Sequence, residues 1–475
     1  MIIPQPTLTI PLFVAAGGVA CYLGAKVLPA SLRAWNGALA ALWFFVSAAL
    51  IVAGGVQPLP LLIGILSCGI GAVAALYSQA RLDPAGPIQL YYPLFLFAAA
   101  GAIGIGFSQD LFTIFVFVEL SAIPSYALVA YRSGEDPHAL RAAFNYLIQG
   151  VAGTITALLG VGLLYVTAGT LSLAALPAAL AGKSTLVIAL GALLILIGYG
   201  VKLAIIPAHF WLPEAYVRAP AGVTALMAGV TKSGALVAVF LSLSVIPPGS
   251  SVAAFLGLAV SVLAVLTMTA GNILALNQKE LNRLLAYSSI AQMGYVLLGF
   301  GLGLQYSLAA GFAAGLLYMV AYAVMKSGAF LAADLFAVEA GSVEISRMRG
   351  IGARRPVLGL AFAIFVLGLV GVPATAGFLG KLLIFQAGMG TLTAWGVGLV
   401  LVMAANSALS LGYYVPVLSD LLFSGTGEER KPHRVSLLAA TCIILFAAGT
   451  VILGFFVPSA LLNGAAGMLL LKGGF

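Results

Sequence analysis

Charged residues are scarce in this chain. Asp, Glu, Lys and Arg make up 7% of its 475 residues, whereas a typical soluble domain carries about 25%. Hydrophobic residues make up 62%, and the mean hydropathy is +1.15. No polar segment between the apolar runs is long enough to form a soluble domain. The composition therefore excludes a soluble globular protein and predicts an integral membrane protein.

Cysteine is also scarce. Cys21, Cys68 and Cys442 lie singly within apolar runs and form no C-x-x-C pair, which excludes an iron–sulfur cluster, a structural zinc site and a disulfide framework. The sequence shows no metal-ligand cluster and no set of serine, histidine and carboxylate. We therefore expect this chain to carry no cofactor and to perform no bond chemistry. Its N-terminal segment lacks the basic region of a cleavable signal peptide, so we expect the first apolar span to be retained.

Segments long enough to cross a bilayer recur along the whole chain, separated by short polar loops. They predict an all-α integral membrane protein with about fourteen transmembrane helices. The predicted spans are approximately residues 6–26, 35–55, 58–79, 90–107, 110–131, 139–168, 186–206 (with a half-helix to about 218), 222–245, 251–276, 281–303, 307–335, 355–388, 394–422 and 436–458.

The basic residues orient these spans. Lys183 falls in an even-numbered loop and Lys472 in the C-terminal tail, whereas the odd-numbered loops and their borders hold many more. Those residues are Lys26, Arg33, Arg81, Arg132, Arg141, Arg218, Lys279, Arg283, Arg347, Arg349, Arg354, Arg355, Arg430, Lys431 and Arg434. Basic loops usually stay on the cytoplasmic side. We therefore expect a multi-pass protein of the inner (plasma) membrane with both termini on the outer side.

Two predicted spans are interrupted. The seventh carries Lys202 followed by Pro207, and the twelfth carries Pro373 followed by Lys381. Proline breaks a helix because it lacks an amide hydrogen and clashes with the preceding turn. The two spans are five helices apart and so run in opposite directions, which predicts two inverted five-helix repeats with broken helices 7 and 12. The predicted units are residues 1–89 (helices 1–3), 90–248 (helices 4–8), 249–422 (helices 9–13) and 423–475 (helix 14).

Five ionisable residues lie inside the predicted spans: Glu119, Lys202, Lys232, Lys326 and Lys381. A charged side chain at the centre of a bilayer costs about 2.5–3.5 kcal/mol, and such residues usually line a polar path. Glu119 is either a neutral, packed acid or the partner of Lys202 in a proton switch. Lys232 lies at mid-span. Lys326 lies nearer the cytoplasmic end, where its side chain could instead reach the interface.

Neutral polar residues follow the same spans. Gln292 follows two serines in LLAYSSIAQMGYVLL, and Tyr322 precedes Lys326 by four residues. Hydroxyls and amides can hold water for proton relay, and they also join helices by hydrogen bonds in membranes. His209 at the first break either shuttles protons or hydrogen-bonds a carbonyl that the break frees. We retain Gln292, Tyr322 and His209 as supporting candidates for the path.

Four stretches of this chain resemble the antiporter-like membrane subunits of respiratory complex I, membrane-bound hydrogenases and multisubunit sodium/proton antiporters. They read FVELSAIPSYALVAY, GYGVKLAIIPAHFWLPEAYVRAPAGVTALMAGVTK, LNRLLAYSSIAQMGYVLLG and GVPATAGFLGKLLIF. Their order is specific to this family, and the resemblance extends over about residues 90–420. It implies fourteen helices in two inverted repeats with a half-channel in each. It also implies proton-path roles for Glu119, Lys202, Lys232 and Lys381.

Two details of the resemblance bear on the branch of the family. Family members often have histidines where this chain has Gln292 and Tyr322, so a histidine-based central relay is not implied here. Tyr322 with Gly328-Ala329-Phe330 is typical of the N-type subunit of complex I, and the N- and M-type subunits are the most similar overall. The motif PEAYVRAP is more typical of the hydrogenase and antiporter branches.

Three functions remain open at this point. The first is a proton-pumping subunit of a redox-driven complex, of the NADH-quinone oxidoreductase or membrane-bound hydrogenase type, whose partner subunits carry the cofactors. The second is the antiporter subunit of a multisubunit sodium/proton antiporter. The third, a stand-alone transporter for an organic anion, is disfavoured because no substrate-sized polar cluster joins the lysines. The expected partners are other membrane subunits, the lipid bilayer and protons, with sodium in the second alternative, and no nucleic acid.

Overall fold

The computed structural model describes residues 6–27, 35–83, 87–423, 435–456 and 459–471. These residues form helices, and their only β structure is two isolated bridges. The helices of the first part of the chain are α1 (Pro6–Val27), α3 (Asn36–Ala53), α4 (Pro58–Arg81), α5 (Ile88–Phe107), α6 (Leu111–Val129), η1 (Ala130–Arg132), α7 (Pro137–Ala168), α8 (Leu176–Leu180), α9 (Thr185–Leu203), α10 (Trp211–Arg218), α11 (Ala221–Leu226), the π-helical turn η2 (Met227–Thr231) and α12 (Lys232–Leu243). Those of the second part are α13 (Ser251–Leu276), α14 (Leu281–Tyr306), α15 (Ala309–Ala340), η3 (Ile345–Met348), α16 (Ile351–Arg354), α17 (Pro356–Val370), α18 (Ala376–Met389), α19 (Ala394–Leu422), α20 (Leu437–Phe455) and α21 (Ser459–Leu471).

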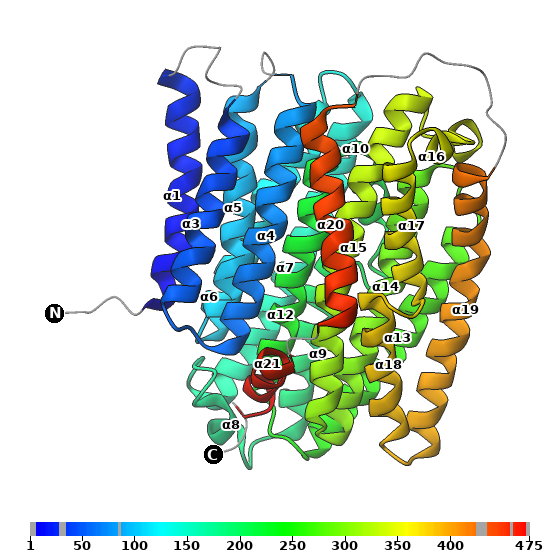
Figure 1. Ribbon diagram of the computed structural model, residues 1–475. Helices are drawn as coiled ribbons and strands as arrows, with labels where there is room; N and C mark the ends of the chain where they lie inside the picture. Colours follow the sequence, from blue (N-terminus) through cyan, green and yellow to red (C-terminus); the bar gives the residue numbers. More distant parts are fainter. Residues whose placement is uncertain (1–5, 28–34, 84–86, 424–434, 457–458, 472–475) are drawn as a thin grey trace.

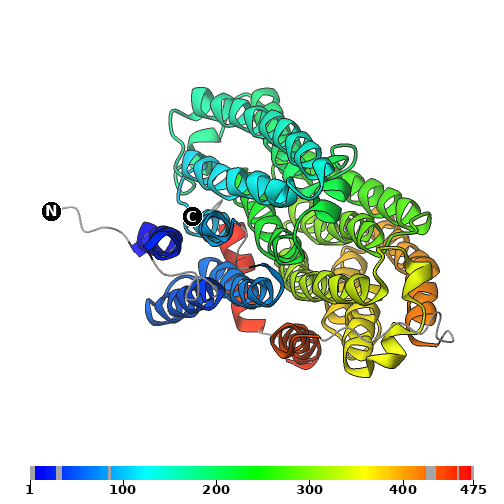
Figure 2. The ribbon, with the colours of Figure 1, turned by 90° about the horizontal axis from the view of Figure 1, so that it is seen from above.

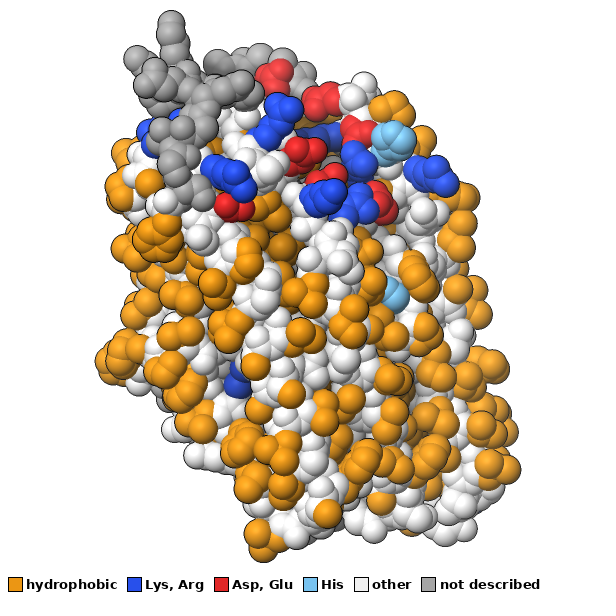
Figure 3. Space-filling model, turned by 90° about the vertical axis from the view of Figure 1, so that its right-hand side faces the viewer, with side chains coloured by type: hydrophobic (Ala, Val, Ile, Leu, Met, Phe, Trp, Pro, Cys, Tyr) orange, Lys and Arg blue, Asp and Glu red, His pale blue; other side chains and the backbone are white. Residues whose placement is uncertain are grey.

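Thirteen helices in the described part of the chain are long and apolar enough to cross a membrane. A bent pair over residues 345–370 passes the same test as a fourteenth span, and the predicted twelfth span is divided between α17 and α18. In Figure 3 hydrophobic side chains cover most of the visible face, while most of its charged side chains gather at one end. The prediction of an all-α, multi-pass membrane protein with about fourteen spans is confirmed.

The two halves of the bundle repeat the same local construction at opposite ends. Asp110, before α6, forms an isolated antiparallel bridge with Ser172, after α7. Glu280, before α14, forms the matching bridge with Glu344, after α15. The first bridge lies near α8, at the bottom of Figure 1, and the second lies near α16, at the top. The two repeats are therefore inverted relative to each other, as predicted from the two broken spans.

Local sequence signals account for the helix ends. The side chain of Asp110 accepts a hydrogen bond from the Thr113 amide (2.8 Å), and that of Asp136 accepts one from the His138 amide (3.0 Å). Such caps satisfy amide groups that have no partner within the helix. At the other end of a helix, Gly371 adopts a left-handed φ of 96° directly after α17, a conformation that favours glycine because it has no Cβ atom.

The helix α21 lies outside the predicted spans. The short helix α21 lies across the bundle at the end opposite the charged side chains (Figures 1 and 2) and packs against α4 and α15. Its inward face includes Leu462, Ala465 and Ala466, all buried. With 13 residues, α21 is shorter than the roughly 20 residues that a bilayer crossing needs. The hydropathy of this segment therefore indicated no span, and its lateral position depends on tertiary packing.

Candidate functional site

The first break separates α9 from α10, and its freed backbone groups find partners in other elements. Ala204 adopts a left-handed φ of 55° and ends α9. The Trp211 indole N–H donates to the Val201 carbonyl (2.8 Å), and the Ile206 amide donates to Oγ1 of Thr267 on α13 (3.2 Å). Non-helical backbone at membrane depth is tolerated only where protein or a cavity surrounds it. A residue of the second half of the chain thus helps to stabilise the interrupted backbone in the first half.

Lys202, near the end of α9, faces Glu119 and Tyr126 of α6. Its Nζ lies 3.8 Å from Oε1 of Glu119 and donates a hydrogen bond to the Tyr126 hydroxyl. Oε1 of Glu119 is buried and has no hydrogen-bond partner among the described residues. Gly150 on α7 permits this approach, because a Cβ atom there would lie 2.1 Å from the Tyr126 hydroxyl oxygen. The ion pair is therefore close but not hydrogen-bonded, with a hydroxyl as the direct acceptor of the lysine.

A cavity lies beside Lys202. It is lined by Lys202, Ser121 and Tyr146 and by Thr231 of the π-helical turn. Lys232 follows Thr231 directly and begins α12. The predicted span over residues 222–245 corresponds to the helical segment Ala221–Leu243, which contains the π-helical turn. A π-helical turn inserts an extra residue, and such turns often occur at functional sites.

Lys232 lies between the two halves. Its Nζ donates to the backbone carbonyl and to Oγ of Ser289 on α14 (both 3.4 Å). The hydroxyls of Ser289 and Tyr322 are hydrogen-bonded to each other. The Lys232 ammonium group also lies 5.9 Å from the centres of the Tyr216 and Tyr322 rings, within the range of cation–π attraction. Lys232 and Tyr322, both predicted site residues, are thus joined through Ser289.

Lys326 does not reach the membrane interface, so that alternative is wrong. Its side chain is fully buried near the middle of α15, which extends to Ala340, five residues beyond the predicted end of its span. Its Nζ donates to the Leu285 carbonyl (2.9 Å), to the Ser288 hydroxyl and to the Tyr414 hydroxyl (3.4 Å). Lys326 thus belongs to the buried interior together with the other lysines.

Gln292 and Lys381 meet at the second break. The Tyr318 hydroxyl donates to Oε1 of Gln292, and Nε2 of Gln292 donates to the Leu369 carbonyl (3.2 Å). Lys381 Nζ donates to the same carbonyl (2.9 Å), to the Val370 carbonyl (2.9 Å) and to Ser407 Oγ (2.8 Å). These carbonyls lie at the end of α17, where they lack partners within the helix and carry its partial negative charge. The break thus leaves free carbonyl groups that accept hydrogen bonds from Lys381.

His209 lies within the first break and is buried. Its Nδ1 lies 3.1 Å from the Pro207 carbonyl oxygen, and the ring donates to that oxygen when Nδ1 carries the proton. This contact fits the alternative in which His209 satisfies a carbonyl freed by the break. Its role in proton transfer stays a prediction.

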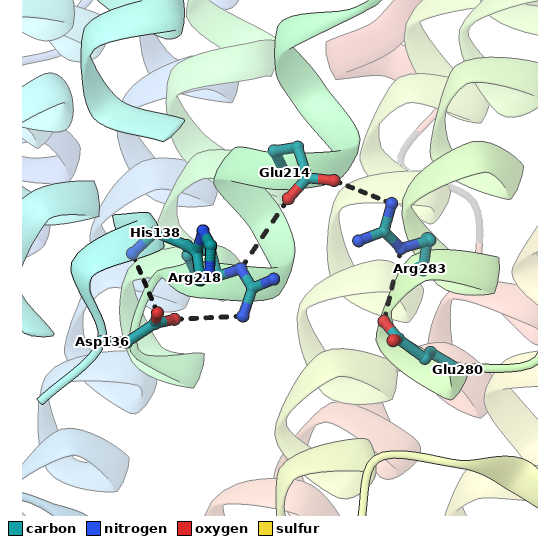
Figure 4. Close-up of polar contacts among 6 residues, drawn as sticks. All are labelled: Asp136, His138, Glu214, Arg218, Glu280 and Arg283. Atoms are coloured by element: carbon teal, nitrogen blue, oxygen red, sulfur yellow. Dashed lines mark hydrogen bonds and ion pairs between the residues drawn. The ribbon is translucent and has the colours of Figure 1, made fainter. Parts of the chain in front are cut away.

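A charged network at one end of the bundle anchors the short helix that follows the first break (Figure 4). Glu214 of α10 pairs with Arg283 of α14 (2.8 Å) and with Arg218 (3.7 Å). Arg218 pairs with Asp136 before α7 (3.1 Å), and Arg283 pairs with Glu280 (3.3 Å). The network therefore ties α10 to both halves of the chain.

Several polar partners of the lysines were not predicted from the sequence. Tyr126 lies seven residues after Glu119, two turns along the same helix face, so helical spacing could have identified it. Tyr414 and Ser407, the partners of Lys326 and Lys381, lie on α19, far away in the sequence. Nothing in their local pattern indicated which lysine they would meet. The described residues contain no group of three or more His, Cys, Asp or Glu residues that could hold a metal ion.

The fold and these contacts define a class: a polytopic membrane protein of two inverted halves, with opposed broken helices and a row of buried lysines between them. The family model described as "NADH:quinone oxidoreductase/Mrp antiporter, TM" matches residues 108–407. The chain belongs to this family, and the resemblance seen in the sequence is confirmed.

Individual relatives support the same assignment. The chain is 38% identical to the NADH-quinone oxidoreductase subunit N 1 of Sorangium cellulosum, over 74% of this chain and 70% of that protein. It is 30% identical to the F(420)H(2) dehydrogenase subunit N of Methanosarcina mazei, over 81% and 79% of the two chains. A chain in the structure of the membrane-bound sulfane sulfur reductase, an archaeal respiratory membrane complex, is 26% identical and covers 98% of this chain and 97% of its own length, with a TM-score of 0.85.

Proposed function

We propose that this chain is a proton-translocating membrane subunit of a redox-driven pump of the complex I or membrane-bound hydrogenase type. The relatives named above as subunits N belong to an NADH-quinone oxidoreductase and an F(420)H(2) dehydrogenase, which supports a redox-driven complex. In this proposal the redox cofactors are bound by partner subunits. The chain itself supplies the path for protons through the membrane.

The observation that carries the proposal is the row of buried lysines between the two breaks. Lys202, Lys232, Lys326 and Lys381 are all at most 7% exposed. Each has a hydroxyl or a backbone carbonyl as acceptor, and the cavity beside Lys202 reaches the residue before Lys232. Desolvated amines without a hydrogen-bonded carboxylate readily exchange their proton. Such groups are suited to hold a proton briefly and to release it.

Like charges give this row a means of coupling. Two unit charges about 8 Å apart repel each other by roughly 2 kcal/mol at an effective dielectric constant of 20. A proton that arrives at one lysine therefore favours loss of the proton from the next. The Glu119–Lys202 pair serves as the switch at one end of the row, because separating the carboxylate from the ammonium favours the neutral lysine. Lys381 at the second break serves as the outlet.

The same contacts would also serve the antiporter subunit of a sodium/proton exchanger, which is our second candidate because the family model covers Mrp antiporters as well. Purification of the tagged chain from its own membranes distinguishes the two. We expect quinone-module or hydrogenase subunits to copurify and the complex to pump protons upon addition of its electron donor. Copurification of small antiporter subunits alone, with sodium-dependent proton exchange, would contradict the redox assignment.

We further propose that the charged end of the bundle faces the cytoplasm and that both termini face outward in the plasma membrane. Ser346 at the charged end and Ser184 at the opposite end are exposed, and the native Cys21, Cys68 and Cys442 are buried. A membrane-impermeant maleimide should therefore label Ser184→Cys in intact cells and Ser346→Cys only after permeabilisation. The reverse pattern would invert the orientation, and labelling of both in intact cells would also overturn the helix count.

A further inference from the structure

A hollow lies at the charged end of the second half of the bundle. It has about 1100 Å³ of empty space, and its rim includes Lys279, Glu344 and Asp420. Its deeper wall includes Tyr413 of α19, which is 3% exposed. Neither the inverted repeats nor the broken helices explain why the second half has a hollow at the charged end.

Only two side chains separate Tyr413 from the surroundings of Lys381. The Tyr413 hydroxyl donates to Oδ1 of Asn272 on α13 (2.9 Å), and Nδ2 of Asn272 donates to the Tyr295 hydroxyl (3.3 Å). The Lys381 ammonium group lies 4.4 Å from the centre of the Tyr295 ring. Asn272 and Tyr295 are completely buried. Hydrogen-bonded side chains thus extend from the hollow to Tyr295, whose ring lies against the Lys381 ammonium group.

The chemistry of Asn272 interrupts this series of side chains for protons. A relay group must accept a proton on one side and give up another, as hydroxyl, amine and carboxylic acid groups do. A carboxamide accepts through its oxygen and donates through its nitrogen, and neither atom exchanges a proton readily. The amide of Asn272 therefore fills the gap with hydrogen bonds and transfers no proton.

Asn406 holds Asn272 in this orientation. Nδ2 of Asn272 also donates to the backbone carbonyl and to Oδ1 of Asn406 (both 3.1 Å), and Nδ2 of Asn406 donates to Oγ1 of Thr269 and to the Val402 carbonyl (both 3.1 Å). Two buried amides with several hydrogen bonds each form a rigid polar network. Such a network specifies a fixed direction for every donor and acceptor around Asn272.

We propose that Asn272, held by Asn406, is a proton barrier between the hollow at the charged end and Lys381. The proposal rests on the proposed function, in which the buried lysines conduct protons. Without the barrier, protons would pass from the charged side through Tyr413 and Tyr295 to the outlet. They would bypass the Glu119–Lys202 switch, and the driving reaction would no longer be coupled to transport.

The test reconstitutes the full chain into liposomes that contain a pH-sensitive dye and measures passive proton influx. A potassium ionophore prevents the build-up of charge. A carboxylic acid can accept and donate a proton, so Asn272→Asp should raise proton influx after a pH jump by about tenfold or more. Asn272→Ser, which introduces a small hydroxyl, should raise it as well and serves if the aspartate variant does not fold. The matched control is Asn36→Asp, at a buried asparagine of α3, which should leave the influx unchanged.

A second pair of variants tests the route. Adding Tyr413→Phe to Asn272→Asp removes the hydroxyl at the hollow and should return the influx to that of the unaltered chain. If Asn272→Asp and Asn272→Ser do not raise the proton influx, Asn272 is not a barrier. A leak through Asn272→Asp that persists without the Tyr413 hydroxyl would also contradict the proposal. If the barrier alone is wrong, substitutions of Lys381 still abolish pumping. If the lysines conduct no protons at all, Lys381→Arg pumps normally.

Discussion

Replacing Glu119 with glutamine should abolish ion pumping while the protein still assembles in the membrane. The substitution preserves the shape of the side chain and removes the charge that lies 3.8 Å from the Lys202 ammonium group. At about 4 Å and an effective dielectric constant of 20, that attraction amounts to roughly 4 kcal/mol. Without it, burial favours the neutral lysine throughout the cycle, and the switch no longer changes state.

The measurement is redox-driven proton uptake by vesicles that contain the assembled complex, together with the rate of electron transfer. Glu135→Gln is the matched control, because this carboxylate is exposed in the loop before α7, and its loss should leave pumping unchanged. Wild-type pumping by Glu119→Gln would show that Glu119 is a neutral, packed acid. Loss of the complex from the membrane would point to a structural role instead.

Both Lys381→Ala and Lys381→Arg should block pumping as completely as Lys232→Ala does, although Lys381 and Lys232 belong to different halves. The alanine variant removes the proton carrier at the outlet. The arginine variant retains the positive charge and can still donate hydrogen bonds to the Leu369 and Val370 carbonyls. Arginine does not release its proton in proteins, however, so the outlet remains permanently charged.

The arginine variant separates a proton carrier from a helix cap. If Lys381 only stabilises the carbonyl end of α17, Lys381→Arg should pump normally while Lys381→Ala loses stability. An active Lys381→Arg protein would therefore place the outlet elsewhere. Lys183→Arg, at an exposed loop lysine, is the control for a general effect of the substitution. The same vesicle assay measures both, with the amount of folded protein determined by size-exclusion chromatography.

The amino-acid sequence by itself determined the class of protein, nearly all of the spans, both breaks and the five ionisable residues within the membrane. These features are local: hydropathy over about 20 residues identifies a span, and Pro207 and Pro373 mark the interrupted helices. A lysine within an apolar run is conspicuous wherever it occurs. The sequence allowed the pairing of Glu119 with Lys202 as one alternative, but it contained no information on the geometry of the pair.

Only the tertiary structure decided which groups meet. Helices in a membrane are surrounded by lipid as apolar as their own interior, so hydropathy does not specify how each helix is rotated against its neighbours. Small residues such as Gly150 permit that packing, and the packing places the Tyr126 hydroxyl on Lys202. It also brings Gln292 and Lys381 to one carbonyl and joins Asn272 to Tyr413 across 141 positions of sequence. These contacts between distant segments depend on helix rotation and register, which no local pattern in the sequence contains.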